Sequence, residues 1–317
     1  MIYSDNVLTI LALKSLKGIG NAWIVRYFHP TKSMDELSEL VNQTTKQTEY
    51  ITTEMLQQIK EYIEYKLQHL SNTDGVVALG DDNFPAYRGD VNAGDRPVVL
   101  FYKGDLSLLS MMHINIAVIG LLKPTLDIEQ YESFVVDALV KRDVVIVSGL
   151  ALGCDTIAHK QTLKSGGKTV AILPSTLEMI NPSSNIPLAE EIVLAGGLLI
   201  TEYYEEAKSK RDYITRYIQR DRLQALFSDG VVLSASYVPN NRGLDSGSRH
   251  AMNSAYKYRI KRAVLYDESL HSTDMMYDLN RLILSEDNSV IDINHNNIKI
   301  ALDKLLARKL SPTFDLI

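Results

Sequence analysis

The sequence lacks the cysteines that a disulfide framework needs. Cys154 is the one cysteine among 317 residues, so no bridge can form within the chain. Such a composition is typical of proteins from a reducing compartment. Neither sequence neighbour of Cys154 is a His or Lys that would lower the pKa of its thiol. We therefore interpret Cys154 as a small buried side chain rather than a nucleophile.

Long hydrophobic runs are also missing. Asp5, Lys14 and Lys17 keep the apolar run near the amino terminus short, and no small-residue cleavage pattern follows it. Elsewhere no run approaches the roughly 20 apolar residues that cross a bilayer. We expect a cytoplasmic protein with no membrane partner.

Positive charge is not in excess, since 33 Lys and Arg face 39 Asp and Glu for a net charge of −6. This balance argues against binding polyanions by overall attraction, so nucleic-acid binding would need a local basic cluster. The Walker loop, the G-x-G-x-x-G fingerprint, the nucleophile elbow and clustered metal ligands are absent as well. We expect no catalytic residue, no metal and no cofactor, and hence a protein that is not an enzyme.

Hydrophobic periodicity divides the chain into three parts. Residues 1–75 repeat apolar side chains at helical spacing and predict a small helical domain of the helix-hairpin-helix type. Its "GIG", Gly18 to Gly20, is interpreted as a turn between helices, with a phosphate-binding turn as the alternative. Residues 76–112 hold short strands broken by Gly, Pro and Asp, and predict a connector that packs on the main domain, residues 113–317.

The third part alternates β-like and helical segments. Continuous apolar runs occupy residues 114–120, 143–149, 168–174, 196–202, 229–235, 262–266 and, more weakly, 288–293. Helical stretches lie between them, at 126–142, 155–165, 186–195, 213–227, 247–260 and 274–285. Strands buried on both faces and joined by helices predict an α/β fold, a Rossmann-like, doubly wound and mainly parallel sheet. In such sheets ligands bind at the carboxyl ends of the strands.

Three groups of residues follow predicted strands and are candidates for binding phosphate. In "SGLALGCDTIAH" the turn residues precede a helix whose first N–H groups attract anions. A dense basic segment carries arginines that suit phosphate and tyrosines on which an unpaired base can stack. A second small-residue turn, "SGS", also begins a helix. These candidates are Ser148, Gly149, Gly153, Asp155 and His159; Arg220 and Arg222; and Ser246, Gly247 and Ser248.

Two of these assignments carry alternatives. His159 is expected one turn into its helix, where a structural role at the helix–sheet contact and contact with a ligand are both open. The basic segment could be a solvated helix face. We favour binding because Arg220 and Arg222 cannot lie on one outward face of a helix, so at least one should point toward a strand end.

The ordered motifs resemble the DNA-processing protein A (DprA/Smf) family. Its "SGxAxGxDxxAH" stands here as "SGLALGCDTIAH", and "GGLLITEY", "RDR" in place of "RNR", and "DSGSRHAMNSA" follow in order. The resemblance covers roughly residues 76–305. It implies a non-enzymatic protein that binds single-stranded DNA, forms a homodimer and helps to load a RecA-type recombinase in natural transformation or recombination. The ten candidate residues would form its phosphate-binding pocket.

The departures from the family pattern indicate a divergent member. The expected "GSR" is "GLL", the "AVPG" strand end is "AVLY", and Asp221 stands between the two arginines, where its charge would weaken an anion site. About ten residues follow the last matching motif, so we expect no C-terminal winged helix.

Two other functions stay open. The same fold could bind, or hydrolyse, a nucleotide derivative, and the domain could serve purely as a dimeric scaffold for a recombinase.

Overall fold

The computed structural model describes residues 3–239 and 247–307. The chain begins with four helices, α1 (Asp5–Ser15), α2 (Asn21–Tyr27), α3 (Met34–Thr44) and α4 (Thr53–Leu67). Side chains of Ser4, Ser33 and Thr52 cap three of them by accepting backbone N–H groups of the first turn. These helices confirm the helical character expected of the amino-terminal segment.

One mixed sheet of nine strands forms the centre of the molecule, in the order β1-β2-β6-β5-β4-β3-β7-β8-β9. Seven of its strands are parallel: β3 (Ile114–Ile119), β4 (Val144–Ser148), β5 (Thr169–Ile172), β6 (Leu198–Thr201), β7 (Gly230–Leu233), β8 (Lys261–Leu265) and β9 (Ile291–Ile293). Each lies within or overlaps a predicted apolar run. The Rossmann-like fold is therefore confirmed.

The segment predicted as a connector, residues 76–112, contributes to the sheet itself. Strands β1 (Gly75–Ala78) and β2 (Val99–Gly104) pair antiparallel, and β2 pairs antiparallel with β6. Two short 3-10 helices, η1 (Ala93–Asp95) and η2 (Leu106–Leu109), lie before and after β2. The segment is thus the antiparallel edge of the sheet, while the domain limits at residues 75 and 112 stay predictions.

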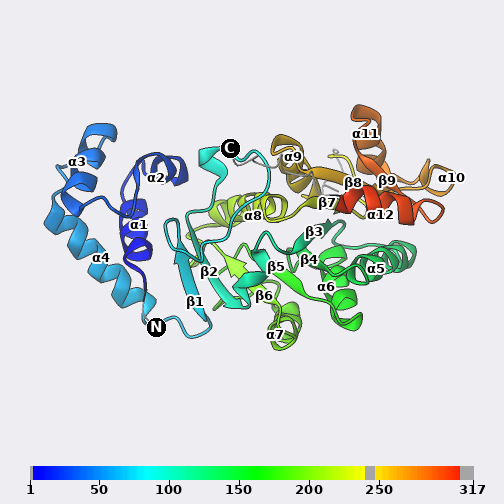
Figure 1. The fold of residues 1–317 in the computed structure, drawn as a ribbon, viewed down its shortest axis with the longest axis horizontal. Coiled ribbons are helices and arrows are strands. Elements are labelled where there is room, and N and C mark those ends of the chain that lie inside the picture. Colours follow the sequence, from blue (N-terminus) through cyan, green and yellow to red (C-terminus); the bar gives the residue numbers. More distant parts are fainter. Residues whose placement is uncertain (1–2, 240–246, 308–317) are drawn as a thin grey trace, which may run out of the picture.

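Helices cover both faces of the sheet (Figure 1). One face carries α8 (Lys210–Leu226), α9 (Ser248–Lys257) and α11 (Asp278–Glu286), whose apolar side chains join one buried cluster with the strands. The other carries α5 (Leu126–Val140), α6 (Cys154–Lys164) and α12 (Ile298–Leu306). The remaining short elements are η3 (Ser183–Asn185), α7 (Ile186–Leu194), α10 (Glu268–His271) and η4 (Met275–Tyr277).

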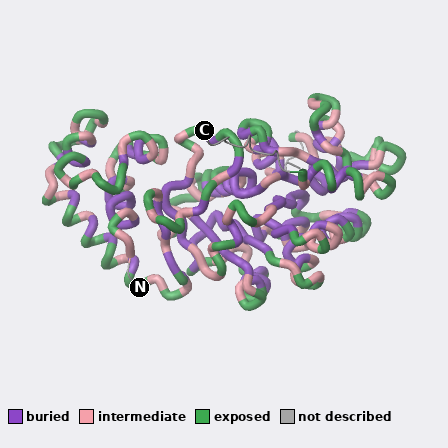
Figure 2. Tube along the Cα trace, viewed as in Figure 1, coloured by how far each residue is buried: buried purple, intermediate pink, exposed green. Residues whose placement is uncertain are grey.

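The amino-terminal helices share a hydrophobic core with the sheet. Ile10 of α1 and Leu56 of α4 belong to the same buried cluster as Phe101 of β2, Leu199 of β6 and Ile192 of α7. Figure 2 shows buried residues both in the central strands and in the amino-terminal helices. Among the residues that the structure describes, no helix is both long and apolar enough to cross a membrane.

Candidate functional site

A cavity of about 340 Å³ lies where the order of the parallel strands reverses. Strand β3 pairs with β4 on one side and with β7 on the other, and the cavity follows the carboxyl end of β3. This switch point is where doubly wound sheets bind their ligands. We call it the strand-end cavity; its lining includes Gly120, Asp155, Tyr217, Arg220, Ser248 and Arg249.

Arg220 is the buried cation of this cavity. The residue is 5% exposed, with its Nη1 atom 3.5 Å from Asp155 Oδ2 and its Nε atom 3.4 Å from Asp221 Oδ1. Its guanidinium carbon also lies 5.7 Å from the centroid of the Tyr217 ring. A Cβ atom on Gly149 would stand 1.2 Å from Arg220 Nη1. Glycine at position 149 therefore makes the room that the guanidinium occupies.

The carboxylate of Asp155 ties the turn after β4 together. Its Oδ2 atom accepts the backbone N–H groups of Gly149, at 3.2 Å, and of Ala151, at 3.3 Å. Gly153, with a φ of 74°, packs so closely that a Cβ atom would meet Leu121 O at 2.2 Å. Asp155 thus binds two amides of the turn and also lies beside Arg220. The phosphate site predicted at the first N–H groups of the following helix stays a prediction.

His159 and Ser148 are not among the residues that line the cavity, and both are fully buried. The Thr169 hydroxyl donates its proton to Ile146 O, at 2.8 Å, so His159 Nδ1, 2.7 Å from that hydroxyl, must be the protonated nitrogen. Burial, assisted by Arg220, lowers the pKa of His159 to about 3, and the ring is neutral. The Ser148 hydroxyl donates to Val118 O at 2.7 Å. Of the two roles left open for His159, the structure places it in the helix–sheet contact.

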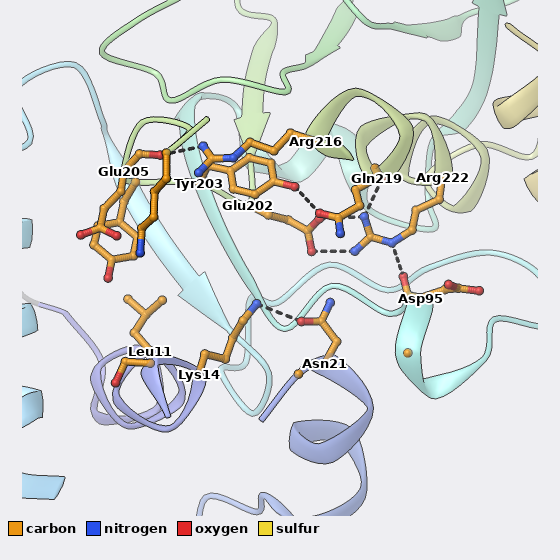
Figure 3. Close-up of a pocket in the computed structure, with 15 residues that line it drawn as sticks. Leu11, Lys14, Asn21, Asp95, Glu202, Tyr203, Glu205, Arg216, Gln219 and Arg222 are labelled. Carbon is orange, nitrogen blue, oxygen red and sulfur yellow. Dashed lines mark hydrogen bonds and ion pairs between the residues drawn. The ribbon is translucent and has the colours of Figure 1, made fainter. Parts of the chain in front are cut away.

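Arg222 lies on the other side of α8 and does not reach the strand-end cavity. Its two terminal nitrogens bind both carboxylate oxygens of Glu202, at 2.8 and 2.7 Å, and its Nε donates to Asp95 O at 2.9 Å (Figure 3). Burial raises the pKa of Glu202, but the charge and hydrogen bonds of Arg222, with smaller contributions from Lys14 and Asn21, together lower it below its usual value. The predicted pairing of Arg220 and Arg222 in one site is therefore corrected, because Glu202 holds Arg222 elsewhere.

Arg222 lines a separate cavity of about 610 Å³ between α1, α2 and α8. Figure 3 shows Lys14 and Asn21 reaching into it from the amino-terminal helices, opposite Arg216, Gln219 and Arg222. Gly20 of the "GIG" turn borders this cavity and begins α2, while Ile19 is buried. The turn thus joins α1 to α2, as interpreted from the sequence.

The second small-residue turn contributes the start of α9. Ser246 lies outside the described residues. Gly247 caps α9 in the left-handed conformation, with a φ of 71°, and the Ser248 hydroxyl donates to Gly120 O at 2.9 Å. Both residues line the strand-end cavity, and Ser248 fastens the start of α9 to the end of β3.

Sequence reasoning missed three polar residues of this cavity. Arg249 and His250 follow Ser248 in the first turn of α9, and Gln224 faces the cavity from α8. Gln224 is 1% exposed, and its Oε1 atom has no hydrogen-bond partner among the described residues. The basic pair directly after "SGS" was the available signal for Arg249 and His250, since a helix start adds its own positive potential.

The electrostatics of the cavity depend on Asp221. Burial raises the pKa of Asp221 to about 7, although Arg220 opposes the rise. Above this pH two carboxylates, Asp155 and Asp221, face the Arg220 guanidinium. Below it Asp221 is neutral, so one negative charge beside Arg220 is lost, which favours an anion.

Comparison with known proteins gives a consistent result. The profile of the family described as "DNA recombination-mediator protein A" matches residues 75–296. DNA processing protein DprA of Bacillus subtilis (strain 168) is 30% identical over 159 residues, which cover 48% of this chain and 52% of that protein. Protein Smf of Escherichia coli (strain K12) is 28% identical over 204 residues, which cover 64% of this chain and 53% of that protein. The chain thus matches about half the length of these curated relatives.

Solved structures are similar over a larger share of the chain. DNA processing protein A from Streptococcus pneumoniae superposes with a TM-score of 0.71 at 21% identity, covering 94% of this chain and 98% of that one. A structure describing the single-stranded DNA binding mode of DNA processing protein A from Helicobacter pylori has a TM-score of 0.56 at 26% identity. The superposition covers 75% of this chain and 100% of that one.

Proposed function

Because the chain belongs to the DNA recombination-mediator protein A family, we propose that it binds single-stranded DNA, with a backbone phosphate in the strand-end cavity. Arg220 carries this proposal, since it is a buried guanidinium at the switch point of the sheet in a chain of net charge −6. Arg249 and the start of α9 add positive potential on the same side. The attraction is local, as an acidic nucleic-acid-binding protein requires.

The surroundings of the cavity suit an unpaired strand. Tyr217 lines it, and Ile214 and Ile218, on the same helix, are 53% and 45% exposed. Exposed apolar and aromatic side chains beside a phosphate site offer surface to bases that have no partner strand. The Helicobacter pylori structure describes a single-stranded DNA binding mode, which supports the same ligand.

The proposed activity is binding without catalysis. The groups that could act on a substrate have other roles: Asp155 holds the turn, and His159 is buried with its pKa lowered to about 3. Burial also raises the pKa of the Cys154 thiol well above its usual value. We further propose that the protein acts as a homodimer and delivers bound DNA to a RecA-type recombinase, as the family relationship supports.

Fluorescence anisotropy with a labelled poly-dT oligonucleotide tests the proposal. The wild-type protein should bind, and its affinity should fall steeply with salt. Arg249→Ala should weaken binding and make the slope of log affinity against log salt shallower by about 0.7, the value for one phosphate contact on a single strand. Arg220→Ala should weaken binding at least as much.

Arg259→Ala is the matched control. The side chain of Arg259 is 81% exposed and lies just before β8, at the amino ends of the parallel strands, so its loss changes the net charge equally but not the site. Equal losses in Arg249→Ala and Arg259→Ala would contradict the proposed site. If the wild type binds no oligonucleotide but mononucleotides raise its melting temperature, the cavity instead belongs to a nucleotide-derivative-binding protein.

A further inference from the structure

The cavity between α1, α2 and α8 is separate from the proposed DNA site, since none of its described lining residues also lines the strand-end cavity. Its volume of about 610 Å³ lies within the roughly 300–1,000 Å³ that is usual for small-molecule sites. The amino-terminal helices form one side of it, and α8 with the segment after β6 forms the other (Figure 3). We call it the junction cavity.

The carboxylates that line the junction cavity already have cations as partners. These pairs are Glu202 with Arg222, Asp95 with Lys257, and Glu205 with Lys66. Lys14, Lys208 and Arg216 also line the cavity and take no part in these pairs. The lining therefore keeps an excess of positive charge.

Lys14 is the cation of the junction cavity that has the fewest partners. Its ammonium group is partly buried, forms no ion pair with a described residue and makes one hydrogen bond, to Asn21 Oδ1 at 2.9 Å. The nearby Glu202 has both carboxylate oxygens bound by Arg222. Burial lowers the pKa of Lys14, although Glu202 opposes the change. An anion in the cavity would compensate this charge and accept from the remaining N–H groups of the ammonium.

The opposite wall adds two further donors. Arg216 is 7% exposed; its terminal nitrogens donate to backbone carbonyls after β6, but its Nε–H has no acceptor in the described part of the chain. The Asp212 carboxylate, 3.3 Å from Arg216 Nη2, does not line the cavity. Gln219 accepts the Tyr203 hydroxyl at its Oε1 atom, at 2.5 Å, and so keeps its NH₂ group as a donor. A ligand that satisfies these groups must present acceptors.

We propose that the junction cavity binds a small organic anion, whose carboxylate or phosphate group accepts from Lys14 and from the donors of α8. The cavity is much larger than an inorganic ion, so the ligand has an organic part, which packs against Leu11 and Tyr204. Because Lys14 belongs to α1 and Gln219 to α8, the bound anion connects the amino-terminal helices to the sheet. This inference does not depend on DNA binding.

Melting temperatures of the full chain, in chloride buffer of constant ionic strength, test the site with two probes. Citrate presents only carboxylates and glycerol 3-phosphate only a phosphate, so the probe that binds identifies the oxyanion. At a concentration 100 times its Kd, measured by calorimetry, at least one probe should raise the melting temperature by about 5 °C. Failure of both probes to bind overturns the proposal.

Two variants test whether the probe binds in the junction cavity. Lys14→Met removes the charge and keeps a flexible side chain of similar length. Gln219→Glu adds a carboxylate at an exposed position of the lining and keeps an oxygen that accepts from Tyr203. Each should weaken binding of the probe at least about tenfold, as expected for loss of a charge-assisted hydrogen bond or addition of a like charge. Wild-type affinity in both variants overturns the site.

Lys17→Met is the matched control, because it makes the same change of charge at an exposed residue that does not line the junction cavity. It should bind the probe as the wild type does. Arg249→Ala should also bind it normally, since Arg249 lines only the strand-end cavity. Loss of binding in Arg249→Ala alone would place the anion in the strand-end cavity and overturn the proposal. Displacement of the probe by poly-dT would assign the junction cavity to DNA and overturn it as well.

Discussion

At the scale of single residues, Asp221 makes DNA binding depend on pH. Its pKa is raised to about 7 by burial, so its negative charge beside Arg220 disappears as pH falls through 7. Poly-dT should therefore bind about threefold more tightly at pH 6.5 than at pH 8, since one nearby charge contributes on the order of 1 kcal/mol and Asp221 is only partly titrated between these pH values. Burial, with a further contribution from Arg249, lowers the pKa of His250 below its usual value, so His250 does not account for this change.

Asp221→Asn should abolish this pH dependence and bind at pH 8 as tightly as the wild type does at pH 6.5. Anisotropy titrations at the two pH values, at constant salt, measure the effect. An unchanged pH dependence in the variant would assign the titration to another group.

Gly149 offers a second residue-scale prediction. The methyl group of Gly149→Ala would meet Arg220 Nη1 at 1.2 Å and Gln224 Nε2 at 2.6 Å, so the guanidinium must leave its position. We expect about tenfold weaker DNA binding and a loss of about 1–3 kcal/mol in the free energy of unfolding, as is usual for overpacking. Gly20→Ala, where a Cβ atom meets nothing within 4 Å, should change neither quantity.

Glu132 predicts how stability varies with pH. The residue is fully buried on α5, and burial raises its pKa to about 8. Between pH 4.5 and 8 the native state holds a proton that the unfolded chain has released, so stability from this group falls as pH rises through that window. Glu132→Gln should remove this pH-dependent loss in the free energy of unfolding, which is on the order of 2 kcal/mol between pH 6 and 8. Urea unfolding of both proteins at the two pH values gives the difference, and parallel curves would contradict it.

At the scale of elements, α8 separates the cavities, and the Arg222–Glu202 ion pair fixes it to the end of β6. Removing one partner of a buried pair costs about 3–5 kcal/mol, because the other charge stays buried. Arg222→Met should show this loss, and the double variant Arg222→Met/Glu202→Leu should recover most of it. Denaturant unfolding measures the free energy of unfolding of both variants. The salt dependence of DNA binding should stay the same in the double variant, since neither residue lines the strand-end cavity.

The elements also show why part of the site could be predicted from the sequence. Residues two apart on a helix point to different sides, so the spacing indicated that Arg220 and Arg222 do not share one helical face, although both were assigned to one pocket. Which of the two faces the strand ends did not follow, because Glu202, 20 residues earlier in the chain, determines it. Arg249 and His250 were missed for a related reason, since their place beside Arg220 depends on how α9 packs against α8.

At the scale of the whole molecule, the parallel part of the sheet could be predicted from the sequence, whereas its antiparallel edge could not. Strands buried on both faces must be continuous apolar runs, and all seven were found. Strand β2 carries partly exposed residues at its end, and Gly, Pro and Asp separate β1 from β2, so the pattern resembled a packed connector. Their place in the sheet depends on pairing with β6, a contact that local periodicity does not encode.

That pairing has a consequence for synthesis on the ribosome. Phe101 of β2 pairs with Thr201 of β6, so the edge of β2 stays unpaired until β6 has left the ribosome. At roughly 5–20 residues per second the delay is on the order of 5–20 s. The amino-terminal helices cannot complete their packing before then either, because their apolar core includes Leu199 and Ile192. The nascent chain therefore exposes an open strand and an incomplete core during this interval, a state that chaperones recognise and that truncation before residue 201 would make permanent.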